Sequence, residues 1–369
     1  MFEPSTSPEC SNLVLTTLGT VEYQGDVWVE LLGPQNPEDA AAVVLTVGHG
    51  GELTPEYMED RTTDDSSCPA SGCKVDTDSF SPEIAFATAQ SMKETYCRLP
   101  YIVINRLARI KLDANREKEE AAQGYTLAGE AWEGYHSMIA TAQEKVMAKF
   151  GTTTNTATME GITGLLVDVH TYKGFDWDPT NGGSLVQWGY TIGENSLNPD
   201  NFCPLDSRTD GVMGTFTFGR NIEGESYECL VRGPKSLASR VMAFPLTSAA
   251  AQCGTAIPSY QYPSVTDVAE DPAFCGTLSS RDACTTYEGG FTNKVHEVLD
   301  WKNHPSVTFE NQESYLHMNT VQLEIPRCIA WATEETRGAV HAEFSHAVSV
   351  GVCSFLNDLF PFAEPCGPP

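Results

Sequence analysis

The sequence predicts an α/β protein built on a mainly parallel, mixed β-sheet that is sandwiched by helices. A continuous apolar run of strand length occurs at residues 40–48, as is typical of a strand that is buried on both faces. Two further strands are predicted at residues 100–109 and 161–172. Two segments with apolar residues at helical spacing, 80–100 and 129–151, lie between these strands. Strands and helices that alternate in this order indicate a parallel sheet.

The remaining elements extend this pattern at both ends. Residues 21–33 alternate apolar and polar side chains, which predicts an early strand or hairpin. Gly151 is expected to end the second helix. Near the C-terminus, residues 315–327 have the pattern of a strand and residues 336–360 that of a helix.

Residues 172–290 differ in composition from the segments on either side. Gly, Pro, Asn and Asp are concentrated there, together with five Cys. This composition indicates long loops with short elements, stapled by disulfides. We therefore predict a single domain over residues 1–369, with residues 172–290 as a loop-rich insertion within it.

The cysteines indicate an oxidising compartment. The chain has 12 Cys but no C-x-x-C pair, so it lacks the motif of zinc ribbons and thioredoxins. Several Cys lie in Pro- and Gly-rich surroundings, as structural disulfides do. Cys68–Cys73 and Cys275–Cys284 are the nearest local pairs. We expect a secreted protein whose signal peptide is absent from this chain, because residues 1–15 lack a basic start and an apolar core.

The charge balance excludes two classes of partner. There are 22 Lys and Arg against 50 Asp and Glu, which gives a formal net charge of -28. A chain this acidic is repelled by nucleic acid and by anionic membranes. No stretch approaches the roughly 18 apolar residues of a membrane span. We therefore predict no nucleic-acid partner and no membrane partner.

Polar side chains gather where the predicted strands end. The carboxyl ends of parallel strands meet at one edge of an open α/β sheet, and ligands bind there. Four predicted strands each deliver polar groups to that edge, which favours a functional site. These residues are His49, Glu52, Arg109, Asp113, Asn115, Arg116, Asp168, His170 and Glu324.

Part of this set has the composition of a catalytic metal site. A catalytic zinc takes three protein ligands of the His, His and carboxylate type and keeps one position for water. His49, Glu52 and His170 would supply them, so we expect one zinc ion per chain. Asp113 or Asp168 would orient a metal ligand or an arginine by a hydrogen bond from outside the ligand set.

The other residues suit the hydrolysis of an amide bond. Zinc polarises a carbonyl group and lowers the pKa of its water. Glu324 would take the proton of that water and pass it to the leaving amine. Arg109 would stabilise the oxyanion, and Asn115 with Arg116 would hold a carboxylate of the substrate.

Three pieces of the sequence are specific: D-x-N-R, the apolar strand that ends in D-x-H, and the double glycine ahead of Q-L-E. In these pieces the sequence resembles the N-formylglutamate amidohydrolase family, a branch of the zinc-carboxypeptidase-like α/β hydrolases that also includes the aspartoacylases and succinylglutamate desuccinylases. The resemblance implies that family's fold and a zinc-dependent hydrolase of an N-acyl amino acid or small peptide. It also implies the roles given above to His49, His170, Arg116 and Glu324. The matching segments run from about residue 43 to 330 and are "GHGGELTPEYMEDR", "INRLARIKLDANRE", "AWEGYHSMI", "GLLVDVH", "EGGFTNKVH" and "VQLEIPR".

The first motif differs from that of the formylglutamate branch, where Ser-Gly commonly follows the histidine. Here "HGGE" resembles the H-x-x-E of carboxypeptidases and aspartoacylases. This resemblance implies Glu52 as the third ligand, with Asp60 as the alternative. The many cysteines and acids favour a secreted relative that acts on another carboxylate-bearing N-acyl amino acid or peptide. A secreted metallocarboxypeptidase and a non-catalytic binding protein that keeps the fold are the alternative functions.

Overall fold

The computed structural model describes residues 10–150, 164–172, 186–189, 237–244, 246–248, 259–261, 292, 296, 318–359 and 364–367. Within them, one eight-stranded sheet runs in the order β1-β2-β4-β3-β5-β8-β6-β7. The strands are β1 (Leu15–Tyr23), β2 (Asp26–Pro34), β3 (Ala40–Val47), β4 (Leu99–Asn105), β5 (Leu165–Tyr172), β6 (Val186–Gly189), β7 (Ser259–Gln261) and β8 (Asn319–Pro326). The helices are α1 (Ser81–Tyr96), α2 (Lys118–Ala122), α3 (Thr126–Phe150), α5 (Leu237–Met242), α10 (Arg327–Ala330) and α11 (Glu334–Leu359).

The centre of the sheet is parallel and its flanks are antiparallel. Strands β4, β3, β5 and β8 run parallel to one another. Strand β2 pairs antiparallel with β4, and β6 pairs antiparallel with β8. The prediction of an α/β fold with a mixed sheet is therefore confirmed. All four central strands end at the same edge, where the candidate site lies.

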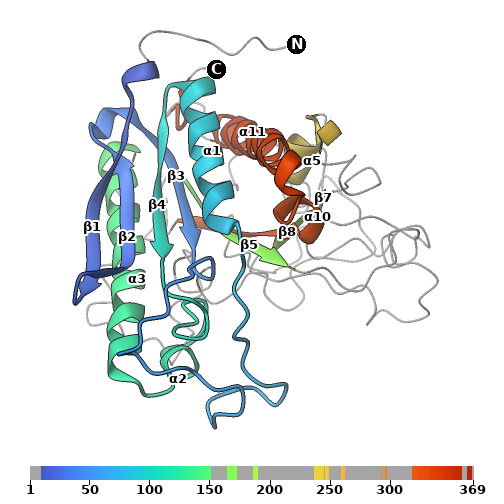
Figure 1. The fold of residues 1–369 in the computed structure, drawn as a ribbon. Coiled ribbons are helices and arrows are strands. Elements are labelled where there is room, and N and C mark those ends of the chain that lie inside the picture. Colours follow the sequence, from blue (N-terminus) through green and yellow to red (C-terminus); the bar gives the residue numbers. More distant parts are fainter. Residues whose placement is uncertain are drawn as a thin grey trace, which may run out of the picture.

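Helices cover both faces of the sheet (Figure 1). Side chains alternate between the faces along each strand. Val44 and Leu166 accordingly lie in one buried cluster with residues of α3. Leu45 and Val167 lie in a second cluster with residues of α1 and α11. Consecutive apolar residues occur in these strands because both of their faces are buried.

The predicted elements lie close to the observed ones. The hairpin predicted at 21–33 is confirmed as β1–β2, and β1 begins earlier, at Leu15. The C-terminal helix predicted at 336–360 is confirmed as α11. The described parts of 172–290 include β6, α5 and β7, so the predicted insertion adds strands to the sheet. Its other residues lie outside those that the structure describes, and the single domain stays a prediction.

Disulfides link several described cysteines. The predicted pair Cys68–Cys73 is confirmed, whereas Cys275–Cys284 lies outside the described residues. Two further bonds join Cys10 to Cys97 and Cys353 to Cys366. These bonds indicate an oxidising compartment. In the described part of the chain, no helix is both long and apolar enough to cross a bilayer.

Candidate metal centre

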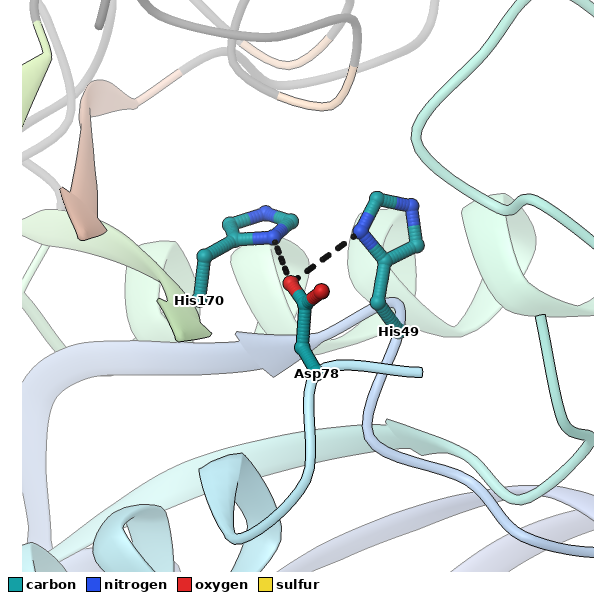
Figure 2. Close-up of side chains that lie close together, drawn as sticks. All are labelled: His49, Asp78 and His170. Atoms are coloured by element: carbon teal, nitrogen blue, oxygen red, sulfur yellow. Dashed lines mark hydrogen bonds and ion pairs between the residues drawn. The ribbon is translucent and has the colours of Figure 1, made fainter. Parts of the chain in front are cut away.

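Two histidines and an aspartate meet at the carboxyl edge of the central strands (Figure 2). His49 follows β3 by two residues, and His170 lies near the end of the neighbouring β5. Asp78 comes from the loop that leads into α1. Both histidines are buried, and the centroids of their rings are 4.8 Å apart.

The three side chains present a ligand set to one point. Oδ2 of Asp78 lies 3.3 Å from Nδ1 of His49 and 2.8 Å from Nδ1 of His170. One ligand atom from each residue lies within 4.8 Å of the other two, so the group could hold a metal ion. Two imidazoles and a carboxylate are the donor set of many catalytic zinc sites.

Asp113 binds Nε2 of His49, the ring nitrogen that does not face Asp78. Nε2 of His49 lies 2.5 Å from Oδ1 of Asp113, which is fully buried. The other oxygen of Asp113 accepts a hydrogen bond from Nε of Arg109 at 2.8 Å. Burial alone would raise the pKa of Asp113, but the charge of Arg109 holds it well below its ordinary value. Asp113 is therefore an ionised acceptor that fixes the proton of His49 on Nε2.

His170 has the same arrangement with Asp168. Nε2 of His170 lies 2.8 Å from Oδ2 of Asp168, and Oδ1 accepts a 2.7 Å hydrogen bond from Thr46. Thr46 and Asp168 are register partners on β3 and β5, which explains their contact. A ligating histidine commonly donates its other ring N–H to a carboxylate. Both imidazoles thus direct Nδ1 toward Asp78, with Nε2 bound to a carboxylate.

Hydrogen bonds of its own backbone fix Asp78. Its N–H donates to the carbonyl oxygen of His49 at 3.0 Å, and its carbonyl oxygen accepts from Oγ of Ser81 at 2.8 Å. Phe80, between Asp78 and the helix, has a φ of 69° in the left-handed region. A bulky residue rarely adopts this conformation. Contacts of its ring with Trp331 and with the guanidinium of Arg337 favour it here.

His170 forms ion pairs with Asp78 and with Asp168. Burial would lower the pKa of His170, but the charge of Asp168 and the hydrogen bond to it raise that pKa well above its ordinary value. Burial would raise the pKa of Asp78, but His49 and His170 hold it far below its ordinary value. A metal ion would therefore replace a ring proton at this site, because only the neutral imidazole is a ligand.

Glu324 lies beside the group on β8. It is the register partner of His170, so both side chains project from the same face of the sheet. Glu324 is buried and accepts a 2.5 Å hydrogen bond from Gln322. Burial raises its pKa to about 7, against the opposing charge of His170. This carboxylate can therefore exchange a proton near neutral pH.

Arg109 lies beside the carboxylates of Asp78 and Asp113, Asn115 lies beside His170, and Arg116 lies at the periphery of the group. Nη1 of Arg109 lies 3.7 Å from Oδ1 of Asp78. Nδ2 of Asn115 lies 3.2 Å from Nε2 of His170. Arg116 is partly exposed, and its guanidinium donates to the carbonyl oxygen of Asn115 and pairs with Glu120.

Glu52 and Asp60 are not part of the group, which corrects the expected third ligand. Gly51 and Leu53 form bridges to the chain after β4, so the side chain of Glu52 between them points the other way and is exposed. Gly51 itself lies so close to the backbone of Arg106 that a Cβ there would overlap it. Asp60 is 59% exposed and pairs with Lys111 at 2.6 Å. Asp78 is the carboxylate between the two imidazoles.

A signal for Asp78 was present in the sequence. A helix that connects two parallel strands begins at the carboxyl edge of the sheet, where the preceding strand ends. Asp78 comes three residues before such a helix, as "DSFSPE" shows. This places Asp78 near the same edge as His49, although the exact approach of its side chain depends on the loop.

Comparisons with known proteins add little to this geometry. No family model and no curated protein sequence matches the chain. Among solved structures, "The crystal structure of gene product Atu2144 from Agrobacterium tumefaciens" aligns over 87% of this chain and 94% of that chain. The TM-score is 0.38 and the sequence identity 11%. A likeness this weak carries neither fold nor function from one chain to the other.

Proposed function

We propose that the protein is a zinc-dependent amidohydrolase that cleaves the amide bond of an N-acyl amino acid or small peptide. The observation that carries the proposal is the joint orientation of His49, His170 and Asp78. Each imidazole has a buried carboxylate behind its Nε2 and offers Nδ1 to the same point. Structural ion pairs do not need two imidazoles aimed at one carboxylate.

The donor set fits one zinc ion per chain. His49, Asp78 and His170 would hold it and leave a position for water, as in catalytic sites. When bound, zinc lowers the pKa of a water toward about 7 and polarises the carbonyl oxygen of a substrate. The carboxylates of Asp113 and Asp168 would make the imidazoles stronger donors.

Glu324 is the proposed general base. It is buried beside His170, and its pKa of about 7 lets it accept a proton at neutral pH and return it. It would take the proton of the attacking water and deliver it to the leaving amine. Two neighbouring carboxylates with different pKa values thus have different roles: Asp78 stays ionised as a ligand, and Glu324 carries the proton.

Asn115 and the two arginines are proposed to bind the substrate. Oδ1 of Asn115 accepts a 2.7 Å hydrogen bond from the backbone N–H of Thr292, so its NH2 group faces His170. When Nε2 of His170 donates to Asp168, it cannot accept from Asn115 as well. The amide hydrogens of Asn115 are then available to a ligand. Arg109 would polarise the scissile carbonyl, and Arg116 would clamp a substrate carboxylate.

The sequence motifs support the same class of fold and activity. The D-x-N-R segment contains Asp113, Asn115 and Arg116, and the D-x-H segment contains Asp168 and His170. Their resemblance to the N-formylglutamate amidohydrolase family is the reason to propose the zinc-carboxypeptidase-like variety of the α/β fold. The disulfides are the reason to propose a secreted member of it.

A substrate panel tests the proposal. Zinc-loaded protein would be incubated with N-acyl amino acids and with short peptides, and free amine would be measured. We expect turnover of at least one N-acyl amino acid, abolished by chelation and by Glu324→Gln. Turnover of peptides only, with release of the C-terminal residue, would instead identify a carboxypeptidase. Zinc binding with no turnover of either class would overturn the enzymatic proposal and favour a binding protein.

A further inference from the structure

A second histidine pair, His136 and His296, is buried on the α3 side of the sheet. His136 lies on α3, and its Nδ1 is 3.0 Å from Nε2 of His296. Nε2 of His136 is 3.1 Å from the carbonyl oxygen of Ala114. Nδ1 of His296 is 3.1 Å from Oε1 of Gln143. The two rings thus form a chain between two carbonyl groups.

The contact between the two rings has the geometry of a hydrogen bond. Their planes differ by 10° and their centroids are 5.3 Å apart. Two imidazoles that lie edge to edge in one plane, joined by a 3.0 Å N···N contact, have about this separation between centroids. Ring N–H groups and ring lone pairs lie in the ring plane. One proton therefore lies between His136 and His296.

The orientation of Gln143 is fixed by a second contact. Its Nε2 lies 2.9 Å from the backbone carbonyl oxygen of His296. A carbonyl oxygen can only accept, so this contact requires the NH2 group. The oxygen Oε1 of Gln143 must then face Nδ1 of His296.

We infer that His136 and His296 together carry three ring protons and hold one positive charge. The carbonyl groups at both ends of the chain cannot donate, so each outer ring nitrogen must carry a proton. The inner contact needs one more. Two neutral imidazoles carry only two protons, so the third makes one ring a cation.

The third proton is shared across the inner contact. Both rings are buried, so burial does not distinguish between them. Nε2 of His136 donates to Ala114 and Nδ1 of His296 donates to Gln143, and the third proton lies between Nδ1 of His136 and Nε2 of His296. Burial lowers the pKa of His136, whereas the hydrogen bond to Ala114 and the charge of Asp168 act in the opposite direction.

The charged pair would act as a positioning element for Asn115. The bond from His136 holds the carbonyl group of Ala114, which precedes Asn115 in the chain. His296 belongs to the same segment as Thr292, whose N–H holds the amide of Asn115. Hydrogen bonds made by an ionised donor are about twice as strong as neutral ones. This role rests on the proposed function, whereas the proton count does not.

Neutron diffraction from deuterium-exchanged crystals of the full chain tests the count directly. We expect three deuterons for the four ring nitrogens: one at Nε2 of His136, one at Nδ1 of His296 and one between the two inner nitrogens. A bare Nδ1 on His296, with two deuterons in all, would overturn the inference. The result does not depend on metal or activity, so failure of the zinc proposal would leave it intact.

A variant extends the test to solution. Gln143→Leu removes the acceptor at Nδ1 of His296, and nitrogen-15 NMR of histidine-labelled protein should then show two ring protons on the pair in place of three. Gln90→Leu, at an exposed glutamine on α1, is the matched control and should leave the His296 signals unchanged. An unchanged His296 spectrum in folded Gln143→Leu would contradict the assignment. Should that variant fail to fold, the wild-type neutron count decides alone.

Discussion

Replacement of Asp168 by Asn tests how far the residues behind the imidazoles determine metal binding. The side chain is fully buried, and its two oxygens accept from His170 at 2.8 Å and from Thr46 at 2.7 Å. In Asp168→Asn the amide oxygen can still accept from His170, because the hydroxyl of Thr46 can rotate and accept from the new NH2 group. The shape of the site is then kept, and the negative charge alone is lost.

The expected loss is about 10- to 100-fold in zinc affinity, or about 1.4–2.7 kcal/mol. A competition titration against a chromophoric chelator at fixed pH measures it. Asp358→Asn is the control, because Asp358 is an exposed residue near the end of α11 that pairs with Arg240. This variant should bind zinc with the affinity of the wild type. An Asp168→Asn variant that folds and binds zinc with wild-type affinity would refute the role assigned to Asp168.

The remaining predictions concern the base, pH and a disulfide. Glu324→Gln should keep zinc and lower kcat by about 10²- to 10⁴-fold in a hydrolysis assay. Since the pKa of Glu324 is raised to about 7 and its ionised form is the base, kcat/KM of the wild type should rise with pH through that value in a pH profile. Because the pKa of His170 is raised on folding, its protonation stabilises the metal-free protein, and this contribution is complete below the ordinary histidine pKa. The free energy of unfolding from denaturant titrations should therefore fall as pH rises through the raised pKa. His170→Asn should remove this pH dependence. Loss of the Cys353–Cys366 bond, which spans 13 residues, should cost about 3 kcal/mol of unfolding free energy.

Each of these predictions has a contradicting result. If Glu324→Gln hydrolysed the substrate at the wild-type rate, Glu324 would not be the general base. A kcat/KM that is flat between about pH 5 and 9 would show that no group with a pKa near 7 limits the reaction. A metal-free protein whose stability rises steadily into alkaline pH would contradict the sign given for His170. Equal unfolding midpoints for the wild type and Cys353→Ser/Cys366→Ser would contradict the cost of the disulfide.

The central strands and the histidines could be predicted because their signals are local. Residues 40–48 and 161–172 are mostly apolar since both faces of β3 and β5 are covered. Parallel pairing then brings the ends of these strands together, so His49 and His170 had to be neighbours. The type of element and the strand direction were enough to place both imidazoles.

The identity of the third ligand, Asp78, could not be predicted from its spacing in the sequence, because its position depends on the conformation of a loop. Glu52 is closer to His49 in sequence than Asp78 is, but paired backbone on both sides turns its side chain to solvent. Asp78 returns to His49 after about 30 residues, and its position depends on the left-handed turn at Phe80. No periodic pattern encodes such a turn.

Metal analysis of the purified protein tests the central claim most directly. Zinc per chain would be measured by elemental mass spectrometry in the wild type and in the matched acid variants Asp78→Ala and Glu52→Ala. We predict about one zinc in the wild type and in Glu52→Ala, and a loss of zinc in folded Asp78→Ala. Zinc retained without Asp78 but lost without Glu52, or no metal in the folded wild type after exposure to zinc, would contradict the metal centre formed by His49, Asp78 and His170.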